Sequence, residues 1–401
     1  MKATTAKNFL AEFDWLLILA LLGLMAVGVA FIYSATMVNP AAASAPFHRQ
    51  LWFKQGVWGA IGLVCAGLVC AINYQRIARF ALIFYWTNIL FLAAVLIPGI
   101  GSMRYGARRW IDLGFFQFQP SEFAKLSLIF ALGHFLSRPK DELRQGHIFF
   151  KALGMIVLPF LLVFKEPDLG SALLLLPVGL AMMFVAGVPA AFLTRLLGGM
   201  AALIALVLVD ILYAPKQLQL PVEEYQRRRL LVFFGRDFAA PDATEKERLL
   251  ARVAQRSHSY NVEQAMISVG SGGLTGKGWM RGTQNALGYL PRAVAHNDFI
   301  FSVIAEESGF VGSVIVVTLY TVVLFVGIRI ASEARDRLGK LLAVGVVTLL
   351  GCHVFINIGM NIRLMPVTGV PLPLLSYGGS SVLCSLIAAG LLQNVHIHRR
   401  S

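Results

Sequence analysis

Apolar runs of roughly twenty residues recur along almost the whole chain, and this repetition constrains the fold more than any other feature. A helix of that length is long enough to cross the hydrocarbon core of a bilayer. The chain has 401 residues, of which only 14% are charged, whereas about 25% is usual in a soluble domain. Strands of a membrane barrel would be shorter and would alternate. The sequence therefore predicts an all-α polytopic membrane protein.

Ten of these runs are predicted to be transmembrane helices of a single integral membrane domain that covers residues 1–401. One long hydrophilic loop, residues 214–297, separates the seventh predicted span from the eighth. The first run is too long for the apolar part of a signal peptide, and we expect it to remain in the protein. The approximate bounds of the ten spans are 15–35, 52–73, 77–98, 120–136, 149–164, 169–187, 191–213, 298–328, 340–362 and 377–396.

Lysine and arginine residues in the short loops predict the orientation. With a cytoplasmic N-terminus, the inner loops hold about twice as many of these residues as the outer loops. This distribution predicts that both termini are cytoplasmic and that loops 99–119, 214–297 and 363–376 lie outside. The net charge of +14 then belongs to residues that flank membrane spans and contact lipid headgroups, so we expect no nucleic-acid partner.

The most informative single residue is Asp298, which stands where the long loop meets the eighth predicted span. An ionisable side chain that enters a bilayer is unfavourable unless it is paired or functional. Asp298 is therefore the first candidate for a functional group. The four cysteines lie in apolar runs without metal-type spacing, and we interpret them as small core residues.

Two further groups of polar residues flank the start of the fourth predicted span. Arg108 and Arg109 lie beside Trp110, which suits the binding of an anionic headgroup, although arginine and tryptophan are also common as interfacial anchors. Glu122 and Lys125 are three residues apart and therefore share one face of a helix. They form either a structural ion pair or the lining of a polar cavity.

Three segments at the outer level carry the remaining candidates. Asp168 could cap the sixth span, or join a network with Lys125. Residues 270–278 are glycine-rich, but their spacing does not fit a phosphate loop; the backbone and Lys277 could still approach an anion, or the segment could be a plain flexible loop. Residues 366–381, which include Ser376, contain three prolines, and irregular backbone at this depth lines a cavity in enzymes and transporters alike.

These motifs, in this order, resemble the SEDS family (shape, elongation, division and sporulation proteins) of bacterial envelopes. Residues 276–284 and the short N-terminal segment are more similar to the elongation members (RodA) than to the division members (FtsW). The resemblance spans nearly the whole chain and rests on residues 106–110, 119–125, 166–170, 270–278, 296–301 and 371–379.

The resemblance implies a peptidoglycan glycosyltransferase that polymerises lipid II, a disaccharide-pentapeptide on undecaprenyl diphosphate, at the outer face of the inner membrane during cell elongation. It implies that Asp298 is the general base for a sugar hydroxyl. The leaving diphosphate would be stabilised by Arg108, Arg109 and Lys277, or by a divalent cation such as Mg²⁺ or Mn²⁺. No organic cofactor is expected. The other residues expected to bind substrate or support its cavity are Trp110, Glu122, Lys125, Asp168 and Ser376.

The resemblance also implies partners: a class B penicillin-binding protein that acts as transpeptidase, and other membrane proteins of the elongation complex. A lipid II flippase is the main alternative, and a scaffold without catalysis is a third. A flippase needs polar groups throughout the depth of the bundle, whereas here they gather at the outer level. The run from Pro291 to His296 departs from the family pattern, because Arg292 stands where an acid is usual and the run is slightly longer. Residues 236–256 form an added charged stretch, whose amphipathic part could lie on the membrane, on the bundle or in solvent.

Overall fold

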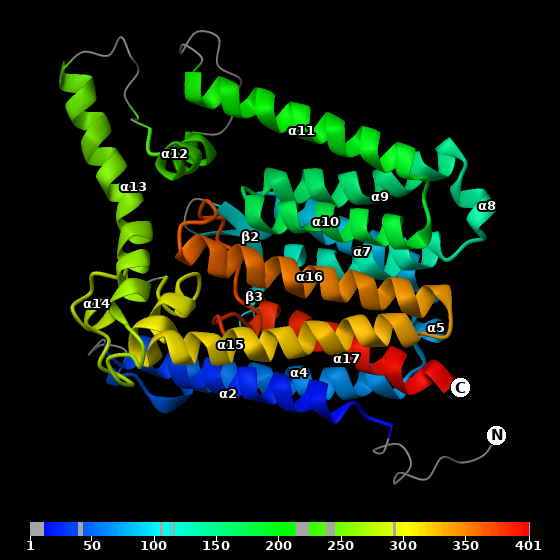
Figure 1. The fold of residues 1–401 in the computed structure, drawn as a ribbon, viewed down its shortest axis with the longest axis horizontal. Coiled ribbons are helices and arrows are strands. Elements are labelled where there is room, and N and C mark those ends of the chain that lie inside the picture. The colour runs from blue at the N-terminus through cyan, green and yellow to red at the C-terminus, as the bar shows by residue number, and fades with distance from the viewer. Residues whose placement is uncertain are drawn as a thin grey trace.

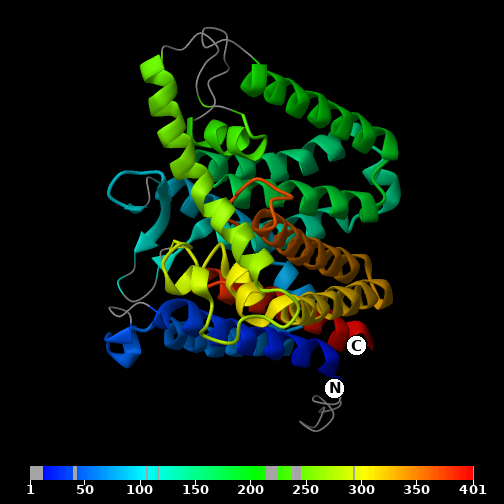
Figure 2. The ribbon, with the colours of Figure 1, turned by 60° about the vertical axis from the view of Figure 1, so that its left-hand side comes forward.

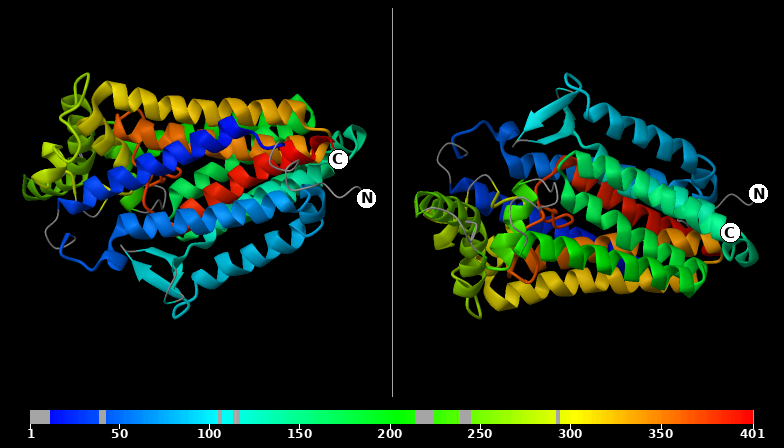
Figure 3. Two further views of the ribbon diagram at one scale, coloured as in Figure 1. Left: turned by 90° about the horizontal axis from the view of Figure 1, so that it is seen from below. Right: turned by 90° about the horizontal axis from the view of Figure 1, so that it is seen from above.

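The computed structural model describes residues 12–38, 43–104, 107–112, 114, 117–213, 224–236, 238, 245–291 and 294–400. Within these ranges, long helices lie side by side in one bundle, and the shorter polar elements gather mainly at its two ends (Figure 1). Helix α17 packs along α4, and α15 packs along α2 and α16. Figure 3 shows the same bundle from its two sides.

The described residues include a helix at the position of every predicted span. Eight of these helices are long and apolar enough to cross a bilayer, whereas α6 has 15 residues and α7 has 17. The prediction of an all-α, multi-pass membrane fold is therefore confirmed, while the number ten stays a prediction. The helices are α2 (Trp15–Met37), α4 (Leu51–Ala71), α6 (Ala81–Val95), α7 (Pro120–Leu136), α9 (Gly146–Lys165), α10 (Leu169–Ala186), α11 (Ala190–Tyr213), α15 (Ile300–Glu333), α16 (Arg337–Asn361) and α17 (Gly379–Ile397).

Local sequence explains where the helices near the predicted site begin and end. Pro120 occupies the first turn of α7, where its missing N–H is not needed. Asp168 caps α10 by accepting a hydrogen bond from the amide of Ser171. Gly187 ends α10 in the left-handed conformation that glycine adopts without strain. Pro120 and Asp168 therefore fix the ends of α7 and α10 that carry the polar side chains.

Helix α7 lies at the centre of the bundle, and α11 lies at its edge. Contacts surround α7 on all sides, from α6, α9, α10, α16 and α17. Nearly every residue of α7 is buried, including Glu122 and Lys125. In α11, by contrast, only Leu193 and Ile211 are buried. A charged pair on α7 is thus surrounded by protein rather than by lipid.

The polar end of the bundle carries the elements that surround Asp298. Helix α13 (Glu245–Ser271) crosses this end, beside α12 (Glu224–Phe233) and α14 (Thr283–Ala286) (Figure 2). The segment predicted as loop 99–119 contains a small antiparallel sheet, β1 (Gly101–Arg104), β2 (Ala107–Asp112) and β3 (Gln117–Phe118). The amphipathic stretch predicted within 236–256 falls partly in α13, and Arg292 lies outside the described residues. The remaining short helices are η1 (Phe47–Arg49), α5 (Tyr74–Ala78), α8 (Lys140–Leu143) and η3 (His398–Arg400).

Candidate active site

Asp298 lies just before α15, and the main chain leading to it is held by the α16–α17 segment (residues 362–378). The amide of Tyr377 donates a hydrogen bond to the carbonyl oxygen of His296 at 2.9 Å. The hydroxyl of Ser376 donates to the carbonyl oxygen of Asn297 at 2.6 Å. Ser376, which we expected near the substrate, is buried and acts on the main chain beside Asp298.

Two asparagines of α16 hold the main chain of Asp298 itself. The side-chain nitrogens of Asn357 and Asn361 each lie 3.1 Å from the carbonyl oxygen of Asp298. Asn357 also donates to the carbonyl of Val370 at 2.8 Å, so the two loops share one anchor. Neither asparagine was predicted as a site residue, although their spacing of four residues in an apolar span places them on one helix face.

The carboxylate of Asp298 is half-buried and feels two positive charges from other segments. Burial raises the pKa of Asp298 to about 6, and the charges of Arg229 and Arg109 act in the opposite direction. Arg229 comes from α12, and its guanidinium donates to the carbonyl of Val367 at 2.9 Å. A carboxylate with such a pKa is ionised at neutral pH and still basic enough to accept a proton, as a general base must be.

Arg109 reaches the site because of an irregularity in the small sheet. The pairing of β2 with β1 shifts at Arg109, which has no partner on β1, and such a bulge re-aims a side chain. The guanidinium of Arg109 donates to the carbonyls of Glu166 and Pro167, to the first at 3.1 Å. Of the two predicted arginines, the structure therefore brings Arg109 to the turn beside Asp298, while Arg108 and Trp110 flank it on β2.

Asp168 joins the starts of α7 and α10. One carboxylate oxygen accepts the cap bond from Ser171 at 3.2 Å. The other accepts hydrogen bonds from the side chains of Ser121, at 3.1 Å, and Gln119, at 3.3 Å. The predicted cap is confirmed, and the side chain of Asp168 contacts Ser121 and Gln119 instead of Lys125.

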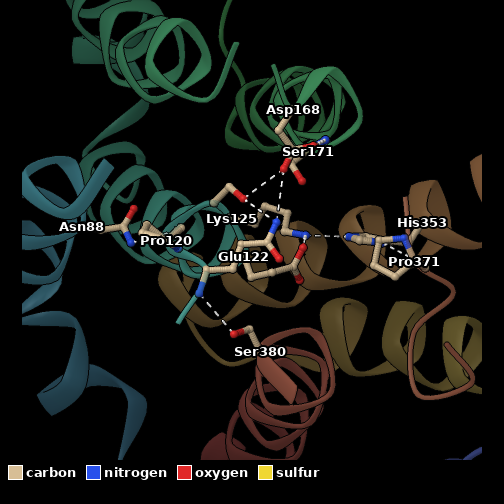
Figure 4. Close-up of polar contacts among 11 residues, drawn as sticks. Asn88, Pro120, Glu122, Lys125, Asp168, Ser171, His353, Pro371 and Ser380 are labelled. Atoms are coloured by element: carbon tan, nitrogen blue, oxygen red, sulfur yellow. Dashed lines mark hydrogen bonds and ion pairs between the residues drawn. The ribbon is translucent and has the colours of Figure 1, made fainter. Parts of the chain in front are cut away.

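Glu122 and Lys125 form a buried pair that extends to a histidine. The ammonium of Lys125 lies 2.6 Å from Glu122 and 3.1 Å from Nε2 of His353 (Figure 4). Nδ1 of His353 lies 3.0 Å from the carbonyl of Pro371, so Nδ1 donates and Nε2 accepts from Lys125. The shared face predicted for Glu122 and Lys125 is confirmed. The three side chains therefore connect α7, α16 and the α16–α17 segment, and the expected role of the pair in supporting the substrate cavity stays a prediction.

Lys277 links its loop to α13, α14 and α15. Its ammonium contacts the hydroxyls of Ser271, at 2.9 Å, and Thr283, at 2.7 Å, and the carboxylate of Glu306 at 2.6 Å. Glu306 is fully buried, and a buried carboxylate that loses its cation is strongly destabilised. The structure therefore gives Lys277 a structural partner, and its expected contact with substrate stays a prediction. The structure also adds Arg229, whose charge acts on Asp298.

The described residues do not provide a ready-made metal site. Among them, no three or more histidine, cysteine, aspartate or glutamate side chains are grouped in a way that could hold a metal ion. Mg²⁺ usually binds through one or two carboxylates, water and substrate phosphate, so the divalent cation implied by the resemblance stays a prediction. The positive charge that the structure does place near Asp298 belongs to Arg229 and Arg109.

Comparisons with known proteins agree with this architecture. The peptidoglycan glycosyltransferase MrdB of Escherichia coli K12 is 36% identical over 343 residues, which cover 85% of this chain and 84% of that protein. A chain in a solved structure described as "Structural coordination of polymerization and crosslinking by a peptidoglycan synthase complex" is 29% identical, with a TM-score of 0.75 over 97% of this chain and 99% of that chain. The crystal structure of the rod shape determining protein RodA of Thermus thermophilus is 28% identical, with a TM-score of 0.64 over 97% of this chain and 98% of that chain. The profile of the FtsW/RodA/SpoVE family of cell cycle proteins matches residues 14–401, and the chain therefore belongs to this family, as its resemblance to SEDS proteins predicted.

Proposed function

We propose that this protein is a peptidoglycan glycosyltransferase that polymerises lipid II, with Asp298 as the general base. The name of the Escherichia coli relative supplies the class of reaction. The observation that carries the residue assignment is the arrangement around Asp298. Its main chain is fixed by two other segments, and its carboxylate lies within the electrostatic range of Arg229 and Arg109.

The proposed chemistry needs one base and one anion-binding site. A sugar 4-hydroxyl attacks the anomeric carbon of a lipid-linked sugar, and the bond from that carbon to the diphosphate oxygen breaks. Asp298 accepts the hydroxyl proton as the new glycosidic bond forms. Negative charge grows on the leaving diphosphate, where Arg229 and Arg109 stabilise it by charge-assisted hydrogen bonds.

The rigid anchoring of Asp298 favours this chemistry over simple binding. A base contributes most when it is held at the reacting atom before the substrate arrives. The hydrogen bonds of Asn357 and Asn361 to the Asp298 carbonyl provide that hold without using its carboxylate. The carboxylate stays available for a proton.

We also infer the cellular location and the protein partners. The proposed location is the bacterial inner membrane, with both termini in the cytoplasm and Asp298 outside. The proposed partners are a class B penicillin-binding protein and other membrane proteins of cell elongation. The similar chain from a complex that coordinates polymerization and crosslinking supports a transpeptidase partner.

Replacing the proposed base tests the function. Asp298→Asn keeps the shape of the side chain but removes the proton acceptor, and general-base catalysis contributes about 10² to 10⁴ in rate. We expect the purified variant, with its transpeptidase, to lose polymer formation from lipid II on gels by at least about 100-fold. Asp141→Asn, at an exposed position of α8 at the other end of the bundle, should keep full activity.

Two outcomes would redirect the assignment. Normal polymerisation by Asp298→Asn would show that Asp298 is not the base. Transport of fluorescent lipid II across vesicles by the same inactive variant would favour the flippase alternative. The proposal requires that the variant is folded, inactive in polymerisation and inactive in transport.

A further inference from the structure

Glu166 is a buried carboxyl group that the structure leaves without hydrogen-bond partners. It lies in the turn between α9 and α10, and its residue is 0% exposed. Neither side-chain oxygen has a partner in the described part of the chain. Buried polar atoms almost always have partners, and each exception calls for an explanation. An isolated buried carboxylate would be strongly destabilising.

The guanidinium of Arg109, which lies beside Glu166, does not form a hydrogen bond with the Glu166 carboxyl group. Arg109 donates to the main-chain carbonyls of Glu166 and Pro167, rather than to the Glu166 carboxyl. Two residues along the chain, the carboxylate of Asp168 is itself held by Ser171 and its other donors. Burial and the negative charge of Asp168 raise the pKa of Glu166 to about 9, against the effect of Arg109.

The charges around Glu166 balance when it is protonated. The charges that act on Glu166 are the negative one of Asp168 and the positive one of Arg109, and the same two residues, with Arg229, also act on Asp298. An ionised Glu166 would leave the group with excess negative charge. Such a site would repel a diphosphate, because like charges brought together in a low-dielectric site oppose binding.

We propose that Glu166 acts as an uncharged carboxylic acid that donates its O–H group to a diphosphate oxygen of the lipid-linked substrate. This inference rests on the proposed function. The unpartnered group supplies a donor, and Arg109 and Arg229 supply positive charge at the same end of the bundle. Glu166 makes and breaks no covalent bond. Its hydrogen bond strengthens as the breaking bond leaves negative charge on the diphosphate.

Two substitutions of Glu166 separate the neutral acid from an ionised one. Glu166→Gln keeps the shape and a donor but cannot ionise, and Glu166→Ala removes the donor. With purified protein and its transpeptidase, we expect Glu166→Gln to stay within about threefold of the wild type in kcat/KM for lipid II near neutral pH. Glu166→Ala should lose roughly tenfold or more. The wild type should lose activity above about pH 9, while Glu166→Gln should not.

Binding of undecaprenyl diphosphate gives a readout that does not depend on turnover. We expect Glu166→Ala to weaken its binding about tenfold and Glu166→Gln to preserve it. Glu306→Gln is the matched control, because Glu306 is equally buried but accepts hydrogen bonds from Lys277, Thr283 and Gln284. That variant should lose thermal stability, whereas Glu166→Gln should not.

The inference is overturned by either of two results. If Glu166→Gln is as inactive and as weak in binding as Glu166→Ala, an ionised carboxylate is required. If Glu166→Ala matches the wild type in both measurements, Glu166 does not contact the substrate. A wild-type protein that forms no polymer from lipid II would defeat the proposed function instead, and the binding measurement would still decide the role of Glu166.

Discussion

At the scale of single residues, the protonation of Asp298 sets the pH range of the proposed reaction. Only the deprotonated carboxylate can accept the hydroxyl proton, and its pKa is raised to about 6. We therefore expect kcat/KM for lipid II to fall as the pH drops through about 6, approaching a tenfold loss for each further unit. Initial rates of polymerisation between about pH 5 and pH 8 measure this limb. A profile that stays flat down to the lowest pH would rule out Asp298 as the base.

Replacement of Arg229 should change the pH at which kcat/KM falls on the acid side, which is the acid limb of the pH profile. The positive charge of Arg229 lowers the pKa of Asp298, so Arg229→Gln should shift the acid limb to higher pH. The loss of a charge-assisted contact to the diphosphate should also reduce kcat/KM by roughly ten- to a hundredfold. Arg228→Gln is the control on the same helix, because the guanidinium of Arg228 lies over the ring of Phe238, at 5.8 Å from its centroid. An unchanged acid limb in Arg229→Gln would contradict the electrostatic coupling.

Site residues could be predicted from the sequence where their contacts lie within one helix. The cap formed by Asp168 and the shared face of Glu122 and Lys125 follow from spacing along one helix, and both are confirmed. Arg229 was not predicted, because its approach to Asp298 depends on how α12 packs on the bundle. The spacing of residues along the sequence does not indicate that packing. The proximity of Lys277 to Glu306 is equally a tertiary fact.

At the scale of elements, the glycine-rich residues 270–278 form hydrogen bonds with the main chain of α15 where that helix is kinked. Gly309 has non-helical dihedral angles, φ 67° and ψ −161°, inside this helix. The amides of Lys277 and Gly278 donate to the carbonyls of Glu306 and Glu307, at 3.0 and 2.9 Å. On the other side of the break, the amides of residues 310 and 311 donate to the carbonyls of residues 273 and 274. The run thus satisfies the hydrogen-bonding groups that the kink releases, as buried backbone requires.

Gly309→Ala should separate this run from α15. A methyl group on Gly309 would lie 2.3 Å from the amide nitrogen of Gly276, and its positive φ adds backbone strain. We expect a lower thermal unfolding midpoint in detergent and a loss of polymerisation, because Lys277 and Glu306 meet across the same contact. Gly270→Ala is the control, since a methyl group on Gly270, in α13, would meet open space and alanine favours a helix. Equal stability of the two variants would show that the close approach is dispensable.

The elements whose structure could not be predicted from the sequence are short polar segments that depend on neighbouring elements. Residues 99–119 were expected to be a loop, yet the antiparallel pairing of β1, β2 and β3 forms a sheet there. Residues 270–278 were interpreted as an anion-binding turn or a flexible loop; the structure shows that they pack on the break at Gly309, and the binding of an anion there stays a prediction. Apolar periodicity located the long helices well, because each of them has enough apolar residues to be recognised by itself. Short polar segments instead take a structure that depends on the elements they contact.

At the scale of the whole molecule, the fold brings side chains from distant segments to one end of the bundle. Arg109, Asp168, Arg229 and Asp298 come from β2, the start of α10, α12 and the start of α15. The order and class of the helices could be predicted from hydropathy. The meeting of these four residues could not, because it depends on helix packing and on the position of the long loop. The family resemblance named three of the four, and the structure added Arg229.

The orientation of the bundle decides whether this end can meet lipid-linked substrate outside the cell. Helix α13 lies at the end that carries Asp298, and α8 lies at the opposite end with the C-terminal end of α17 (Figure 1). The excess of lysine and arginine in the short loops predicts that α8 lies on the cytoplasmic side. We expect a membrane-impermeant maleimide to label Lys246→Cys in intact spheroplasts, and Lys140→Cys only after permeabilisation, because both positions are exposed. The parent protein, whose four free cysteines lie within helices, gives the background. Labelling in the reverse pattern would place Asp298, Arg229 and Arg109 on the cytoplasmic side, where growing glycan strands are absent. That result would contradict the proposed extracytoplasmic polymerisation, even if every residue assignment were correct.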